Sequence, residues 1–165
     1  MDGVDRQHPE HPLPDGTGDS RGAPPLYVFD ADVLQKHFPG MYAAPPAVNE
    51  VFGRFPQAHQ LFLGPAGSGA PFHFHEPAVN ALLYGRKRWW FQAPGQAGYS
   101  KHPPGFGAYS SGGGVNGTAI LSCIQDPGEM LFIPRLWGHS TVNLDEAVGI
   151  ALEFDSLAYQ MPGAP

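Results

Sequence analysis

Two histidines separated by one residue, His73 and His75, are the best candidates for chemistry in this sequence. They lie in residues 71–90, PFHFHEPAVNALLYGRKRWW, and alternation along a β-strand would put both imidazoles on one face. A third histidine, His139, follows a Pro-Gly turn and an apolar strand candidate. Three imidazoles that a double-sheet fold brings together could hold a divalent metal. The alternative is that His73 and His75 hydrogen bond across strands inside a polar barrel lumen.

Lys87 is the residue that would bring an anion to such a site. It lies between Arg86 and Arg88, so on a strand the two arginines share one face and Lys87 takes the other with Trp89. If the arginines point to solvent, Lys87 points inward, and a buried lysine needs an anionic partner such as a ligand carboxylate or an acidic residue of the chain. The alternative is a lysine on a solvated face. Asn80 could donate its amide to the same ligand or cap a turn.

The pattern of apolar residues predicts a mainly β fold around these candidates. Short apolar segments follow one another from residue 58 onward, and turn residues separate them, which is typical of a β-sandwich or small barrel. A helical pattern precedes them at residues 31–37, where Asp30 is placed to cap it. The predicted strands cover residues 59–63, 72–76, 80–84, 88–92, 119–125, 130–134, 141–144 and 147–154.

Composition and charge limit the class of protein. The 165 residues are 42% hydrophobic and 12% aromatic, which is enough for a folded core. Nine Lys and Arg residues against fifteen Asp and Glu residues give a net charge of -6, so the broad basic surface of a nucleic-acid-binding protein is missing, and we expect no nucleic-acid partner. The single cysteine, Cys123, is predicted to be a small buried side chain and fits a reducing compartment. Neither a signal peptide pattern nor an apolar run of membrane-spanning length occurs, so we expect a soluble, intracellular protein without membrane contact.

The chain is predicted to contain one domain with two tails. Residues 1–24 are polar and contain scattered Gly, Pro and Asp, so we expect a disordered leader. Residues 25–158 form the predicted domain, and residues 159–165 form a C-terminal tail. Within the domain, residues 95–118 are a Gly-, Ser- and Pro-rich insertion, which is either a lid or binding loop or plain disorder.

Four segments resemble the Jumonji C (JmjC) domain of iron- and 2-oxoglutarate-dependent oxygenases, a family of the cupin superfamily. Residues 25–30, PLYVFD, look like the first strand of the small JmjC-only hydroxylases, and the glycine loop at residues 63–69 looks like the loop before the family's first metal ligand, here His73. Residues 80–89, NALLYGRKRW, are similar to the strand that carries the 2-oxoglutarate lysine. Residues 127–145, PGEMLFIPRLWGHSTVNLD, are similar to the segment that brings the last histidine. The resemblance covers nearly all of the predicted domain.

The resemblance implies a fold, two cofactors and a set of site residues. The fold is a double-stranded β-helix, or cupin-like jelly roll, with a few short helices, mostly N-terminal. The metal is Fe(II), with His73 as the first ligand and His139 as the distal one. The co-substrate is 2-oxoglutarate, whose far carboxylate would pair with Lys87, and Asn80 is a candidate for the same pocket. A protein or peptide is the expected substrate.

The chain departs from the family pattern at the second metal ligand. The family motif is His-x-Asp/Glu, and its acidic position falls on His75, whereas Glu76 comes one residue later. Either His75 completes the site, or a one-residue bulge brings Glu76 in. Three neutral histidines would leave the metal more positive and would favour zinc or copper as well as iron.

These observations lead to three hypotheses on function. The first is an Fe(II)/2-oxoglutarate-dependent dioxygenase that hydroxylates or demethylates a protein or another substrate. The second is a catalytically degenerate JmjC-like binding module, because His75 stands where an acid is expected and Ala151 stands where some relatives place a polar co-substrate contact. The third is a three-histidine cupin-type metalloenzyme that does not use 2-oxoglutarate, in which Lys87→Ala would leave the activity intact.

Overall fold

The computed structural model describes residues 25–41, 58–100 and 121–154, and about half of these residues lie in short β-strands. Two short helices, α1 (Asp32–His37) and the 3-10 helix η1 (Pro39–Met41), separate the first strand from the rest. The strands, in chain order, are β1 (Val28–Asp30), β2 (Ala58–Gly64), β3 (Ala78–Tyr84), β4 (Lys87–Gln92), β5 (Leu121–Gln125), β6 (Met130–Ile133), β7 (Gly138–Asn143) and β8 (Ala147–Glu153).

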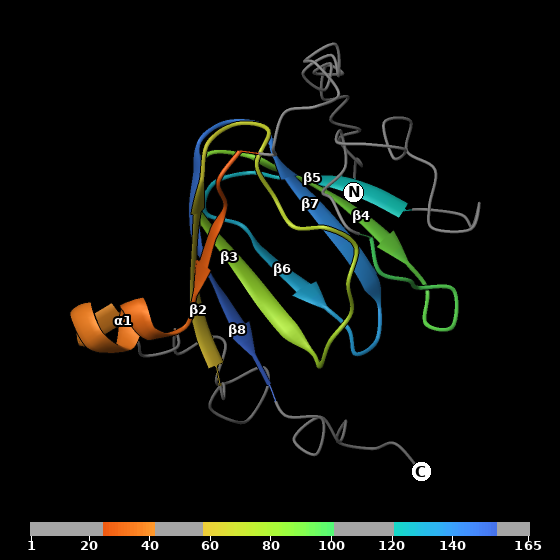
Figure 1. Cartoon of the computed structure of the whole chain (residues 1–165), viewed down its shortest axis with the longest axis horizontal. Helices are drawn as coiled ribbons and strands as arrows, with labels where there is room; N and C mark the ends of the chain where they lie inside the picture. The colour runs from red at the N-terminus through yellow and green to blue at the C-terminus, as the bar shows by residue number, and fades with distance from the viewer. Residues whose placement is uncertain (1–24, 42–57, 101–120, 155–165) are drawn as a thin grey trace, which may run out of the picture.

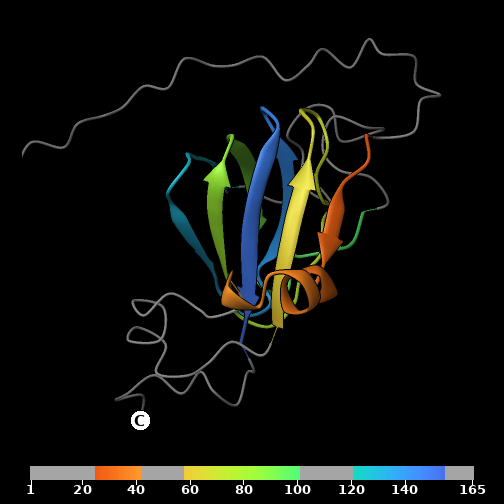
Figure 2. The same cartoon turned by 90° about the vertical axis from the view of Figure 1, so that its left-hand side faces the viewer.

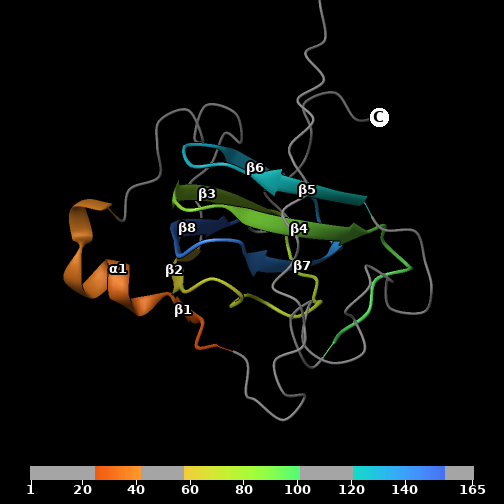
Figure 3. The same ribbon diagram turned by 90° about the horizontal axis from the view of Figure 1, so that it is seen from above.

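The strands form two antiparallel sheets that face each other (Figure 1). The larger sheet has the order β1-β2-β8-β3-β6 and the smaller one the order β5-β4-β7, and both orders can be followed from above in Figure 3. Strands far apart in the sequence are neighbours, because β2 and β3 both pair with β8, and β4 pairs with β7. The predicted double-stranded β-helix is confirmed.

Helix α1 lies against the outer face of the larger sheet (Figure 2). The predicted cap is present, since Oδ1 of Asp30 accepts hydrogen bonds from the backbone N–H groups of Asp32 at 2.7 Å and Val33 at 2.9 Å. The buried side chain of Leu34 anchors the helix. In the part of the chain that the structure describes, no helix has the length and apolar character needed to cross a membrane.

The inner face of the larger sheet forms one end of the core. Phe62, Gly149 and Leu82 are paired directly across β2, β8 and β3. A side chain at Gly149 would lie 2.2 Å from the ring of Phe62, so this glycine makes room for the phenylalanine ring inside the fold. A second cluster, made of Ala78, Trp89 and Ile133, joins the two sheets further along the interior.

The predicted strand at residues 72–76 is wrong. His73 forms a single isolated bridge with His139, and its neighbours in this stretch belong to no strand. Pro71 and Pro77 flank the segment and have no N–H to donate to a ladder, which explains why the alternating pattern does not continue as a strand.

Cys123 is also placed differently from the prediction, because its side chain is exposed. It lies on β5, which is an edge strand of the smaller sheet. The residue type of a cysteine does not tell whether its strand lies at the edge or in the centre of a sheet. The predicted disordered leader at residues 1–24, the tail at residues 159–165 and most of the insertion at residues 95–118 lie outside the described residues.

The turn before β4 offers a test of the packing. Gly85 has φ of +76°, and an added Cβ would lie 2.0 Å from the carbonyl oxygen of Glu146, whereas Gly95 has φ of +81° and no atom within 4 Å of such a Cβ. We expect Gly95→Ala to lower the free energy of unfolding by about 1 kcal/mol through backbone strain alone. Gly85→Ala should cost about 3 kcal/mol or more because it adds a clash with backbone. Urea unfolding of both variants measures the difference, and equal losses would contradict this packing.

Candidate functional site

Three histidines come together between the two sheets. His73, His75 and His139 each offer a ring nitrogen, and these ligand atoms all lie within 4.8 Å of one another. The ring centroids of His73 and His139 are 4.2 Å apart, and those of His75 and His139 are 4.7 Å apart. His139 belongs to β7, and the other two come from the irregular segment that runs beside it. The arrangement has the donor type and the spacing of a metal-binding site.

The backbone beside β7 explains how two residues of one segment reach the same place. The N–H of Thr141 bonds to the carbonyl of Ala70 at 3.1 Å, and His139 and His73 then exchange two bonds of 2.9 and 3.0 Å. From the first contact to the second, the chain moves by two residues on β7, from Thr141 to His139, but by three residues on the facing segment, from Ala70 to His73. One extra residue is therefore accommodated between Ala70 and His73, as in a β-bulge, and such irregularities re-aim side chains beside functional sites.

Backbone carbonyls orient all three imidazole rings. In each ring Nδ1 lies within hydrogen-bonding distance of a carbonyl oxygen, so Nδ1 carries the proton and Nε2 keeps its lone pair for a ligand. The contacts are His73 with Pro71 at 2.7 Å, His75 with Glu76 at 2.5 Å and His139 with Trp137 at 3.0 Å.

Burial favours the neutral form of two of the three histidines. Desolvation lowers the pKa of His139 well below its usual range, and the neighbouring His73 lowers it further. Desolvation is also the main reason why the pKa of His73 is lowered. Neutral imidazoles are the form that binds a metal, so His73 and His139 are favoured in the form that ligates.

The structure brings His75 into the cluster and leaves Glu76 outside it. The carboxylate of Glu76 pairs instead with the guanidinium of Arg135 at 3.1 Å on the surface. The bulge considered for Glu76 is thus not formed at that residue, and the geometry favours His75 as the second ligand.

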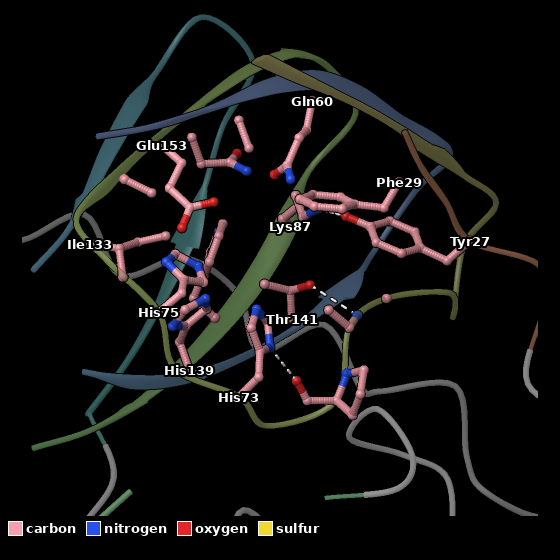
Figure 4. Close-up of a pocket in the computed structure, with 17 residues that line it drawn as sticks. Tyr27, Phe29, Gln60, His73, His75, Lys87, Ile133, His139, Thr141 and Glu153 are labelled. Carbon is pink, nitrogen blue, oxygen red and sulfur yellow. Dashed lines mark hydrogen bonds between the residues drawn. The ribbon is translucent and has the colours of Figure 1, made fainter. Parts of the chain in front are cut away.

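The histidines open into a pocket of about 400 Å³ between the sheets (Figure 4). Lys87 and Tyr27 lie in the same pocket, away from the histidines. The register of β4 and β7 explains the separation, since His139 is paired with Phe91 and Lys87 with Asn143. Trp89 lies between these two pairs and forms part of the wall.

Lys87 is buried in aromatic surroundings, which confirms its predicted inward orientation. It is 1% exposed, its Nζ donates to the hydroxyl of Tyr27 at 2.7 Å, and it lies 3.8 Å from the ring centroid of Phe62. Burial lowers the pKa of Lys87 to about 7 and raises that of Tyr27. Among the described residues no carboxylate pairs with this lysine. A bound anion would therefore stabilise the charged form of Lys87 in the pocket.

Asn80 supplies a second unsatisfied group in the same pocket. It is buried, and in the described part of the chain its Oδ1 has no hydrogen-bond partner. The side chain of Gln125 supports this wall from behind, because it donates to the backbone oxygen of Asn80 at 3.0 Å and accepts from Nε1 of Trp89 at 2.9 Å. Sequence reasoning missed Gln125 as well as Tyr27, which lies 60 positions from Lys87. Tyr27 belongs to the PLYVFD segment, but the resemblance of that segment pointed only to a first strand.

Comparison with known proteins finds several relatives of similar sequence and a solved structure of the same fold. No family model matches the chain. The chain is 31% identical over 160 residues to JmjC domain-containing protein 8 of Rattus norvegicus, a match that covers 87% of this chain and 52% of the relative. It is 29% identical over 167 residues to arginine-specific demethylase JMJ22 of Arabidopsis thaliana, covering 86% and 32%. It is 30% identical over 104 residues to the 2-oxoglutarate and iron-dependent oxygenase JMJD4 of Danio rerio, covering 54% and 25%.

Among solved structures, the Escherichia coli ribosomal oxygenase YcfD superposes with a TM-score of 0.54 and 18% identity, over 79% of this chain and 32% of that one. The two chains therefore share the double-stranded β-helix fold. The sequence relatives narrow the class, and the chain belongs to the JmjC-domain proteins. It spans about half the length of the JmjC domain-containing protein 8 sequences that it matches.

The buried charge of Lys87 has a measurable effect on stability. Its folded-state pKa of about 7 lies below the ordinary 10.5, so between these values the unfolded chain binds more protons, and the stability of the wild type rises with pH. Lys87→Met removes the charge and should raise the free energy of unfolding at pH 7. This gain should shrink by about 4 kcal/mol between pH 7 and pH 10.

Urea unfolding across this pH range measures the effect. The exposed lysine Lys36, which pairs with Asp32 at 3.1 Å on α1, provides the control, because Lys36→Met should change stability by a nearly constant amount over the same range. A gain for Lys87→Met that does not vary with pH would contradict the burial of a titrating ammonium.

Proposed function

We propose that this chain is the catalytic domain of an Fe(II)/2-oxoglutarate-dependent dioxygenase that acts on a protein or peptide. The observation that carries the proposal is that a three-histidine cluster and a buried lysine without a carboxylate partner share one pocket. The names of two relatives, an arginine-specific demethylase and a 2-oxoglutarate and iron-dependent oxygenase, support this chemistry. In this reaction one atom of O₂ enters succinate and the other enters the substrate, while CO₂ leaves.

The donor set fits iron. His73, His75 and His139 would hold Fe(II) through Nε2, because each Nδ1 is engaged by a backbone carbonyl. Imidazole nitrogens suit Fe(II) as well as other divalent metals of the first transition row. Bound iron would supply the oxygen activation that amino-acid side chains lack.

The other part of the pocket fits a dicarboxylate. The ammonium of Lys87 and the hydroxyl of Tyr27 would bind the carboxylate far from the metal, and a charge-assisted bond to Lys87 would supply the anion that this group needs. Asn80 lines the same pocket, and its side-chain NH₂ group is the donor that a carboxylate could accept from. The buried indole of Trp89 forms an apolar wall between the two parts and keeps water from the bound molecule.

The two alternatives differ from this proposal in what they ask of Lys87. A three-histidine enzyme without 2-oxoglutarate is favoured by His75 at the acidic position of the motif. A degenerate binding module would need neither the metal nor an anion. Under either alternative the buried ammonium of Lys87 has no counter-charge, and such a charge costs free energy. We therefore favour the 2-oxoglutarate-dependent reaction over both alternatives.

The turnover of 2-oxoglutarate tests the proposed activity. Purified protein with Fe(II), ascorbate and O₂ should convert 2-oxoglutarate to succinate, and a panel of peptides should increase the rate. Lys87→Met should raise the apparent Kd of 2-oxoglutarate by about 100-fold because it removes a charge-assisted hydrogen bond. Metal affinity should be unchanged in this variant. A folded protein that forms no succinate with any peptide of the panel would contradict the proposed activity.

The choice of the second ligand is tested by a pair of neighbouring substitutions. His75→Ala should weaken Co(II) binding by about 100-fold or more, since it removes a ligand outright. Glu76→Ala should leave the affinity nearly unchanged because this carboxylate pairs with Arg135 outside the cluster. Calorimetric titration with Co(II) distinguishes the two, and the reverse order of effects would show that Glu76 is the ligand.

A further inference from the structure

We propose that Glu153 is the carboxylate that offsets the charge of the metal ion held by the three histidines. It would act from the pocket wall beside the cluster, as a positioning residue for the ion and its bound water. This inference rests on the proposed metal site and deepens it. It gives a role to a residue that the His-x-Asp/Glu motif does not contain.

The register of the larger sheet directs Glu153 into the pocket. On β8 it is paired with Ala58 of β2 on one side and with Ala78 of β3 on the other. Both neighbours are small and apolar, so neither offers the carboxylate a polar contact. The side chain points toward His75 in Figure 4, and Glu153 is part of the pocket lining.

Few of the side chains that line the pocket carry a charge. Among the residues that line it, Glu153 carries the only carboxylate and Lys87 the only amine. Lys87 points toward Tyr27, to which it donates a hydrogen bond, and does not pair with Glu153. Within the described segments, no hydrogen bond or ion pair engages the Glu153 carboxylate.

A negative charge here would stabilise the bound metal ion. Three neutral imidazoles leave the full double charge of a divalent ion uncompensated in a buried site, where solvent screens it poorly. The neighbouring acid in the sequence, Glu76, is already paired with Arg135 at 3.1 Å. A carboxylate on the facing strand can lower the energy of the bound ion without displacing a histidine. Residues in the outer shell of a metal site typically contribute about 10- to 100-fold to the metal affinity.

Metal titration of two isosteric variants tests the inference without any measurement of activity. Glu153→Gln keeps the shape of the side chain and removes its charge, and it should raise the Kd of Co(II), and of Fe(II) under anaerobic conditions, by about 10- to 100-fold. Glu76→Gln is the matched control and should change the Kd by less than about twofold, since its partner is a surface guanidinium. Glu153→Asp keeps the charge and should recover most of the affinity.

The outcomes separate this inference from the proposed function. If the wild type binds Co(II) and Glu153→Gln binds it equally well, the role of Glu153 is refuted and the three-histidine site stands. The same conclusion follows if Glu153→Asp is as weak as Glu153→Gln. If the wild type itself does not bind Co(II), the metal site of the proposed function fails, and this inference fails with it. Thermal unfolding of the metal-free variants should match that of the wild type, and a lower melting temperature for Glu153→Gln would point to a structural role instead.

Discussion

Two backbone hydrogen bonds between His73 and His139, of 2.9 and 3.0 Å, hold the candidate site together. They tie a segment without regular structure to β7, and they do so at the residues whose side chains form the cluster. A second contact, from the N–H of Leu136 to the carbonyl of His75 at 3.0 Å, holds the other end of this segment. Backbone hydrogen bonds at His73, His75 and His139 therefore help to bring the three rings together.

The charges of the pocket are the second constraint. The three histidines line one part of the cavity, and the amine of Lys87 is buried in another part. An unpaired ammonium in a protein interior costs free energy. The part of the cavity beside Lys87 therefore suits an anion better than an apolar ligand. A divalent ion at the histidines and a dicarboxylate reaching from it to Lys87 would satisfy both parts at once. Glu153 would supply the remaining negative charge on the side of the ion.

Much of the fold could be predicted because it depends on local patterns. Alternation of apolar residues located most of the strands, and the position of Lys87 between two arginines gave its inward orientation. The spacing of His73 and His75 predicted that both rings face one site, although the strand on which this prediction rested does not form. The pattern was misleading at residues 72–76, where Pro71 and Pro77 prevent a regular ladder.

The remaining parts of the site depend on which strands become neighbours, and no local pattern contains that information. Tyr27 reaches Lys87 because β1 is added to the edge of the larger sheet beside β2. Glu153 faces the histidines only because β8 lies between β2 and β3. The pairing of Glu76 with Arg135, which removes that acid from the site, likewise joins residues 59 positions apart.

If one pocket binds a metal at the histidines and 2-oxoglutarate between that metal and Lys87, the two ligands must contact each other. Anaerobic titration with Fe(II) and 2-oxoglutarate, followed by visible absorption, measures this contact. We expect a metal-to-ligand charge-transfer band that requires both components and saturates at one equivalent of each. Binding of Fe(II) without such a band at saturating 2-oxoglutarate would contradict this expectation.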